Sequence, residues 1–206
     1  MASTSRSKNG IIIGVVGAGI GLLLVVAVIF GGSNGSDGRP EFGEPTIEGL
    51  ALPPMPQTSL QDTSANGLVS PRLAGIGYDN DTVVIGIDGR PKGVVFLAHW
   101  CPHCQEEVPR VQAWLDAGGG VDGVDLYSVS TAVDSSRPNY PPSTWLDAEG
   151  WTVPVIRDDQ ASSAHRAYGG GGFPYWVFAN SDGTVALRTS GQLQTEQLVQ
   201  ILESLN

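Results

Sequence analysis

The sequence predicts an α/β fold for residues 67–206, with a central mixed β-sheet flanked by helices. Short runs rich in β-branched and aromatic residues alternate there with stretches of helical periodicity, and turns rich in Gly, Pro, Asn and Asp separate them. Apolar residues make up 41% of the 206, which is enough to bury a core. We therefore expect one α/β domain with a long N-terminal extension.

Six runs have the composition of strands: Thr82–Ile87, Gly93–Ala98, Val124–Ser130, Val153–Ile156, Tyr175–Ala179 and Thr184–Thr189. Three runs are helical in character: Cys104–Ala117, Gln160–Tyr168 and a segment from Thr195. The strands on either side of Cys104–Ala117 should form a βαβ unit, which is almost always right-handed. The last two strands should form a hairpin across Asn180–Gly183.

The N-terminal extension begins with a candidate membrane anchor. Residues 11–30 are twenty consecutive residues without a charge, enough to cross a hydrocarbon core of about 30 Å as a helix. A cleaved signal peptide is the alternative, but no A-x-A pattern follows Phe30. Arg6 and Lys8 predict that residues 1–10 stay in the cytoplasm and that the rest of the chain is exported. We expect a single-pass protein of the cell membrane.

Residues 31–66 have the composition of a flexible linker, because Gly, Ser, Pro, Asp and Glu dominate and no periodicity is evident. The chain has a formal net charge of −10, and residues 31–206 hold 9 basic and 21 acidic side chains. Such a surface repels nucleic acid, so we expect no nucleic-acid partner.

The chain has two cysteines, Cys101 and Cys104, which lie in one Cys-x-x-Cys motif. A zinc site would need four ligands, and besides the thiols the chain offers only His99, His103 and His165. A purely structural disulfide across so short a loop would remove little entropy from the unfolded chain. A redox dithiol fits better, because the pair follows a buried strand and begins a helix; it needs no metal and no organic cofactor.

The helix start predicts different roles for the two thiols. Free N–H groups and the helix dipole favour a thiolate at Cys101, which would be the exposed nucleophile. Cys104, one turn further, would be the buried resolving thiol. Pro102 suits the first helical position, and His103 would add to the stabilisation of the thiolate.

The motif His99-Trp100-Cys101-Pro102-His103-Cys104 after a strand, followed by Pro109, resembles the thioredoxin superfamily over residues 67–206. Glu107-Val108-Pro109 and the runs 151–169 and 171–185 are similar to its membrane-anchored TlpA/ResA branch. The dipeptide Pro102-His103 instead matches DsbA, whose motif is also Cys-Pro-His-Cys. The resemblance implies a thioredoxin-like fold.

The resemblance also implies that Phe173-Pro174 is a cis peptide beside the cysteines that binds an extended substrate chain. Trp100 would pack beside the thiols, although it would serve equally well as ordinary core. Thioredoxin and DsbA carry a buried carboxylate six residues before the nucleophile, where this sequence has Val95. Glu107, His99 or water would then move the proton. His165 is expected on the surface of its helix.

These features predict an extracytoplasmic thiol-disulfide oxidoreductase that acts on exported proteins and is recycled by an unidentified redox partner. His103 favours disulfide formation, towards which we lean, whereas the TlpA/ResA resemblance favours reduction, for example of apocytochrome c before haem attachment. The alternative of another class is a non-catalytic thioredoxin-like binding module with the cysteines locked as a bridge. The sequence leaves the direction, the substrates and the oligomeric state open.

Overall fold

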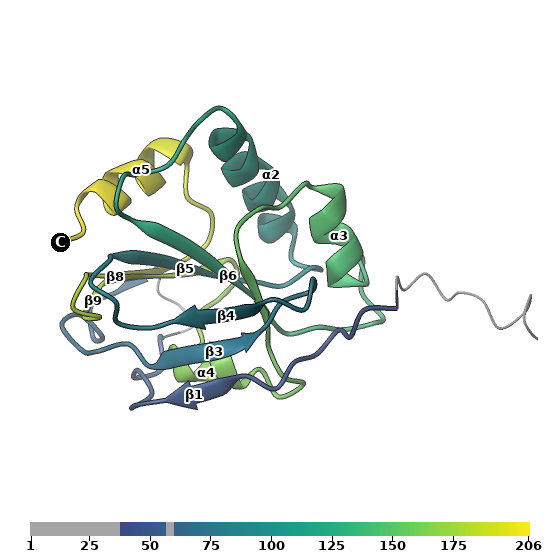
Figure 1. Ribbon diagram of the computed structural model, residues 1–206, viewed down its shortest axis with the longest axis horizontal. Helices are drawn as coiled ribbons and strands as arrows, with labels where there is room; N and C mark the ends of the chain where they lie inside the picture. The colour runs from purple at the N-terminus through teal and green to yellow at the C-terminus, as the bar shows by residue number, and fades with distance from the viewer. Residues whose placement is uncertain (1–37, 57–59) are drawn as a thin grey trace, which may run out of the picture. The chain divides into compact units, whose positions relative to one another are not determined.

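A six-stranded mixed sheet lies at the centre of the computed structural model, which describes residues 38–56 and 60–206 (Figure 1). In spatial order its strands are β2 (Gln61–Asp62), β9 (Val185–Ser190), β8 (Tyr175–Ala179), β5 (Lys92–Leu97), β6 (Asp125–Ser130) and β7 (Val155–Arg157). Strands β5, β6 and β7 are parallel, and β8 joins β5 antiparallel. A second, antiparallel sheet has the order β1 (Thr46–Glu48), β3 (Arg72–Ile76) and β4 (Thr82–Ile85).

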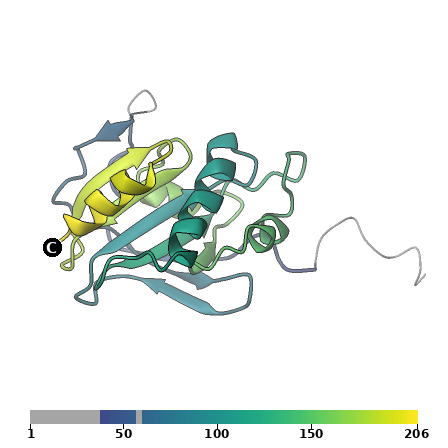
Figure 2. The ribbon, with the colours of Figure 1, turned by 90° about the horizontal axis from the view of Figure 1, so that it is seen from above.

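The helices are α2 (Pro102–Asp116), α3 (Pro142–Ala148), α4 (Ser163–Ala167) and α5 (Thr195–Glu203). Helices α2 and α5 cover one face of the large sheet, and they lie side by side in the view from above (Figure 2). Helix α4 and the small sheet lie on the other face (Figure 1). Because both faces are covered, all six residues of β5 are buried.

The two faces of β5 divide the core. Val94 and Phe96 face the cluster under the small sheet and α4. Val95 and Leu97 face the cluster under α2 and α5, which also contains both cysteines. The alternation is the period-two pattern of a strand, and it brings β5 directly under the start of α2.

The predicted strands and helices are present with small shifts of their ends, and β8 has the predicted bounds. Helix α4 is shorter than the predicted Gln160–Tyr168, because Asp159 and Ser162 form a turn before it. Strands β1, β2 and β3 and helix α3 were not predicted. Arg72–Ile76 is a short run of mixed polarity that contains a glycine, so its composition does not indicate a strand.

The predicted flexible linker over residues 31–66 is wrong for its described residues, 38–56 and 60–66. They contribute β1 and β2, and Leu52, Met55 and Ala65 lie in the core. The amides of Leu52 and Met55 donate to the carbonyls of Ala167 and Gly169 at 2.8 and 2.7 Å. A proline-rich segment packs here without periodicity because these separate anchors hold it. We call residues 49–66, as far as described, the strap.

The candidate anchor, residues 11–30, lies outside the described residues. Within the described ranges, no helix has the length and apolarity to cross a membrane.

Candidate active site

The two cysteines lie where β5 gives way to α2. Cys101 is the N-cap of α2 with extended backbone angles (φ −79°, ψ 121°), and Pro102 occupies the first turn. The proline costs nothing there, since the first N–H groups of a helix have no partner within it. Cys104 lies within the first turn, on the side that faces the core. Both thiols are free.

Burial differs between the two thiols, although less than the sequence suggests. Cys104 is 0% exposed and Cys101 is 7% exposed. The prediction of an exposed nucleophile is therefore wrong, since Cys101 is buried. The ring of Trp100 meets that of Phe173 edge-on, with centroids 6.0 Å apart, and the Cys101 Sγ lies 3.6 Å from the Phe173 carbonyl oxygen.

The surroundings give the two thiols opposite acidities. Hydrogen bonding from Cys104 is the largest influence that lowers the pKa of Cys101 to about 6, and the N–H groups of Cys104 and His103 and the charge of His103 assist it against burial. Burial is the main cause that raises the pKa of Cys104. Cys101 is therefore a thiolate at neutral pH while Cys104 keeps its proton.

A carboxylate lies below the thiols on the same helix. Glu107 follows Cys104 by three residues and is 1% exposed. Its Oε1 accepts the indole N–H of Trp176 at 3.0 Å, and its Oε2 accepts from Arg110 Nη1 at 3.0 Å. Burial raises its pKa above the ordinary value for a glutamate. The negative charge of Glu107 in turn contributes to the raised pKa of Cys104.

Val95 offers no carboxylate, and the buried carboxylate on its side of the sheet belongs to Glu107 of α2. Val95 is buried in β5 and is paired with Trp176 of β8. The Trp176 ring stacks on Phe178, with centroids 5.4 Å apart, and reaches Glu107 with its N–H. Glu107 thus faces the same side of the sheet as Val95.

Both ring nitrogens of His99 have hydrogen-bond partners away from the cysteines. It is buried, its Nδ1 lies 2.7 Å from the Pro138 carbonyl oxygen, and its Nε2 accepts the Asp134 N–H at 3.2 Å. Nδ1 must therefore carry the proton, and burial lowers the pKa of the ring. Both nitrogens are used to hold residues 134–138, so His99 is a structural residue.

Phe173-Pro174 is a cis peptide bond, as the resemblance predicted. Trp100 does lie beside it, and the indole N–H of Trp100 donates to the Ala132 carbonyl at 2.7 Å. The guanidinium carbon of Arg137 lies 4.6 Å from the centroid of that indole. His103 is exposed, next to the thiolate that its charge favours. Two rim features were missed, Arg137 and the second cis peptide Tyr140-Pro141, because no local pattern links them to the cysteines.

His165 was expected on the surface, but its ring is partly buried against Phe173, with centroids 4.7 Å apart. No spacing rule would have linked it to the cysteines, because the contact depends on how the chain turns between α4 and β8.

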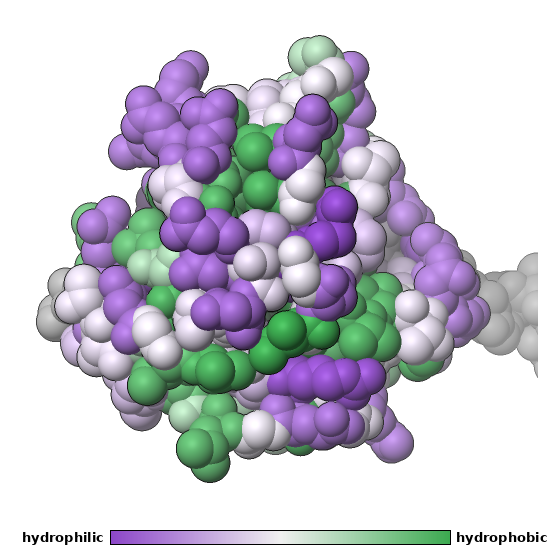
Figure 3. All heavy atoms as spheres, turned by 60° about the vertical axis from the view of Figure 1, so that its left-hand side comes forward, coloured by the Kyte–Doolittle hydropathy of each residue, from purple (hydrophilic) through white to green (hydrophobic). Residues whose placement is uncertain are grey.

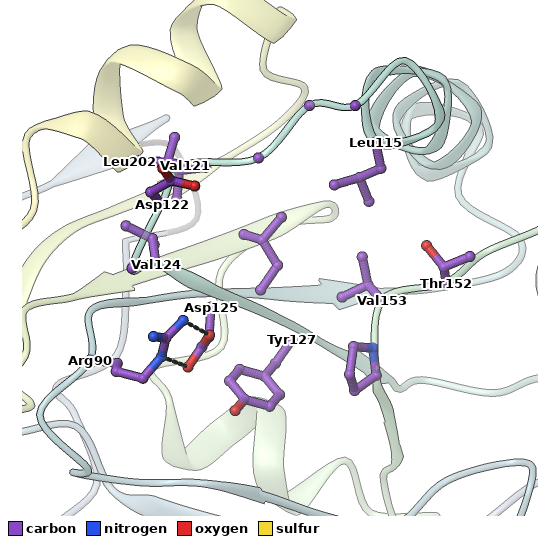
Figure 4. Close-up of a pocket in the computed structure, with 16 residues that line it drawn as sticks. Arg90, Leu115, Val121, Asp122, Val124, Asp125, Tyr127, Thr152, Val153 and Leu202 are labelled. Atoms are coloured by element: carbon purple, nitrogen blue, oxygen red, sulfur yellow. Dashed lines mark hydrogen bonds and ion pairs between the residues drawn. The ribbon is translucent and has the colours of Figure 1, made fainter.

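Several grooves in the described part of the chain lie away from the thiols. One of about 580 Å³ lies at the opposite end of the parallel strands, between Leu115, Val153 and the Arg90–Asp125 ion pair (Figure 4). Another, of about 410 Å³, is lined by Leu50, Leu68 and Val69, which are exposed. Figure 3 shows that apolar side chains gather in a band across the lower part of one face. Within the described residues, no group of three or more His, Cys, Asp or Glu side chains suits a metal ion.

Residues 78–206 match the family model of the thioredoxin-like domain, and the chain belongs to this family. No curated protein matches it. Solved structures with the same fold include StoA from Bacillus subtilis, which is 24% identical and has a TM-score of 0.51 over 60% of this chain and 90% of StoA.

A DsbF homologue from Corynebacterium diphtheriae is 18% identical, with a TM-score of 0.60 over 76% of this chain and all of the homologue. A thiol:disulfide interchange protein from Chlorobium tepidum is 21% identical, with a TM-score of 0.54 over 68% of this chain and 96% of that protein. The predicted thioredoxin-like fold is therefore confirmed.

Proposed function

We propose that this protein is an extracytoplasmic thiol-disulfide oxidoreductase that exchanges disulfides with exported proteins. The observation that carries the proposal is the asymmetry of the thiols: a Cys101 with a pKa of about 6 at a helix start, next to a buried Cys104 with a raised pKa. The proteins of similar fold from B. subtilis, C. diphtheriae and C. tepidum support it, since the last is named a thiol:disulfide interchange protein.

The exchange proceeds in two steps. The Cys101 thiolate attacks one sulfur of a substrate disulfide, which forms a mixed disulfide and releases the other substrate sulfur as a thiolate. Cys104 then loses its proton and attacks the Cys101 sulfur, which releases the second substrate thiolate and leaves the Cys101–Cys104 disulfide. The substrate gains two electrons and the protein loses two; the reverse sequence oxidises a substrate dithiol.

Proton transfer at Cys104 is assigned to Glu107. The carboxylate is buried one helical turn from Cys104, and burial raises its pKa above the ordinary value for a glutamate. Such a group can accept the proton as Cys104 attacks and return it in the reverse direction. The substrate chain would lie against Trp100 and Phe173, whose carbonyl oxygen lies 3.6 Å from the Cys101 sulfur.

We favour disulfide formation as the physiological direction, because a pKa of about 6 at Cys101 stabilises the reduced protein and makes its disulfide a stronger oxidant. The competing direction is reduction, as the TlpA/ResA resemblance suggests. The reduction potential of the full chain distinguishes them: a value near about −120 mV supports oxidation, and a value near about −270 mV supports reduction.

We further propose that residues 11–30 anchor the protein in the cell membrane with residues 1–10 in the cytoplasm, on the basis of the uncharged run and the basic residues before it. Protease treatment of intact cells tests this, since only an exported thioredoxin-like domain would be digested.

Substitution of Cys104 tests the activity. Cys104→Ser removes the resolving thiol, so Cys101 should accumulate mixed disulfides with exported proteins that a reductant releases. Cys101→Ser is the matched control and should trap none. If neither variant traps a protein, and the wild-type chain exchanges no disulfide, the non-catalytic binding module is the correct function.

A further inference from the structure

Four consecutive glycines, residues 169–172, connect α4 to Phe173. Glycine has the most backbone freedom to lose, and these residues have no side chains with which to fix themselves. The loop nevertheless leads directly to the Phe173 carbonyl, which lies 3.6 Å from the Cys101 sulfur. Other residues must therefore hold the loop if Phe173 is to stay beside the thiolate.

His165 contacts this loop at three points. Its own carbonyl accepts the Gly170 N–H at 2.9 Å, and its ring Nε2 lies 2.9 Å from the Gly171 carbonyl oxygen. Its ring also lies against the ring of Phe173, with centroids 4.7 Å apart and planes at 33°. A carbonyl only accepts, so Nε2 carries a hydrogen and donates.

The ring of His165 is itself held in place. It meets Tyr175 edge-on at 5.8 Å and lies 5.6 Å from Phe96, both measured between centroids. Asp158 fixes the start of α4, because its carboxylate accepts the N–H groups of Ala164 and His165 at 2.9 and 3.1 Å. His165 thus connects a helix of fixed position to a loop whose glycines have no side chains that could hold it.

We propose that His165 is a positioning residue that fixes Phe173 beside Cys101 for the binding of an extended peptide substrate. This inference rests on the proposed function and adds to it a residue that contacts neither thiol. The inference predicts that substitution of His165 affects peptide substrates and not small disulfides. A peptide disulfide must lie along Phe173 to reach Cys101, whereas a small aliphatic disulfide reaches the sulfur without that support.

The donor and the ring of His165 are separable by substitution. His165→Gln keeps an N–H donor near the position of Nε2, His165→Phe keeps the ring without a donor, and His165→Ala removes both. Arg166→Ala is the matched control, because its exposed side chain lies on the same short helix and bonds only to Ser163 among the contacts described.

The test is single-turnover reduction by the reduced full chain in detergent solution, with two substrates: a peptide that contains one disulfide, and bis(2-hydroxyethyl) disulfide. With the peptide, His165→Ala and His165→Phe should raise the half-saturating concentration about five-fold or more, the size expected for one lost hydrogen bond. The limiting rate, and the rate with the small disulfide, should change less than two-fold. His165→Gln should recover most of the peptide binding, and Arg166→Ala should match the wild type.

Equal losses with both substrates, or a His165→Gln variant as defective as His165→Ala, would show that His165 merely supports the fold. No loss in any variant would overturn the inference as well. These results differ from failure of the proposed function, in which the wild-type chain itself would reduce neither substrate.

Discussion

Trp176 of β8 donates its indole N–H to the carboxylate of Glu107 on α2 at 3.0 Å. The bond crosses from the sheet to the helix directly below the cysteines, and it fixes the orientation of the one buried carboxylate that is three residues from Cys104. Because the charge of Glu107 influences the pKa of Cys104, we expect the two groups to exchange a proton. The first prediction follows from it.

Glu107→Gln should slow the resolution of the mixed disulfide at least ten-fold at pH 7, because the amide keeps the bond to Trp176 and loses the ability to take a proton. Rapid-mixing measurements of the release of substrate thiol give this rate as a function of pH. In the wild type the rate should rise through a pKa above that of an ordinary glutamate, as the burial of Glu107 requires, and the variant should lack this rise. Glu106→Gln changes an exposed neighbour and serves as the control; a Glu107→Gln profile like that of the control would assign the proton to water.

The reduced protein should lose stability on acidification. The pKa of Cys101 is lowered from 9.0 to about 6 in the folded state, so the stabilisation is present above the unfolded value and disappears as the pH falls through about 6. Between pH 8 and pH 5 the loss from this group should be roughly 2–3 kcal/mol. Urea unfolding of the reduced chain and of Cys101→Ser measures it as the change in their difference. A difference that is the same at both pH values would mean that the thiolate is not stabilised.

Arg188 should hold the strap to the sheet. Its side chain is 0% exposed, forms an ion pair with Asp62 and donates to the Pro53 carbonyl at 2.5 Å. Arg188→Met removes the charged partner of Asp62, which is 14% exposed and keeps its bonds to Ser64, so we expect a cost of about 1–3 kcal/mol. Hydrogen exchange at the amides of Leu52 and Met55 should accelerate together with this loss.

Arg72→Met is the control for the strap, because its ion pair with Glu48 is exposed at both ends and should contribute less than about 1 kcal/mol. Because the strap contributes residues to the core, residues 67–206 alone should have a much lower free energy of unfolding than a chain that starts at residue 38. Unchanged exchange in Arg188→Met would show that the backbone hydrogen bonds and apolar packing hold the strap without Arg188.

His99 should act on stability rather than on proton transfer. His99→Leu removes the partners of the Asp134 N–H and the Pro138 carbonyl; because both residues are exposed and water can replace the lost partner, we expect a total cost of about 1 kcal/mol. Since burial lowers the pKa of His99, the wild type should also lose stability as the pH falls below the ordinary value near 6.5, and His99→Leu should lose less. In the oxidised protein, which has no Cys101 thiolate for His103 to stabilise, His103→Leu at this exposed position should leave stability unchanged. If His99→Leu had normal stability but a slower resolution step, His99 would again be a candidate for proton transfer.

Local pattern and resemblance together predicted the residues nearest to the chemistry. The run Tyr175–Ala179 is apolar throughout because β8 is covered on both faces, so its bounds could be read directly. The place of Cys101 at the start of α2 follows from the strand before it and from Pro102. The candidate pair Glu107 and His99 could be named from the sequence, but only the hydrogen bonds distinguish a buried acid from a histidine with both nitrogens in use.

The remainder depends on contacts between distant residues. From the sequence alone, Arg188 would be expected on the surface. In the fold it forms hydrogen bonds with Asp62, which lies 126 positions earlier in the chain. Leu52 and Met55 lie in a segment whose composition is that of a linker, and their burial follows from single hydrogen bonds to the α4–β8 region rather than from any periodicity. The role of His165 could not be predicted for the same reason. A short helix followed by a glycine loop does not indicate which residues the loop contacts.

The stacked pair Trp176 and Phe178 gives the molecule an optical property. Because the indole of Trp176 is 1% exposed and bonded to the Glu107 carboxylate, we expect its emission to respond to the charge of that carboxylate. The difference in fluorescence between the wild type and Trp176→Phe isolates this signal from the other four tryptophans. The charge of Glu107 could thus be followed by tryptophan fluorescence during turnover, without an attached dye.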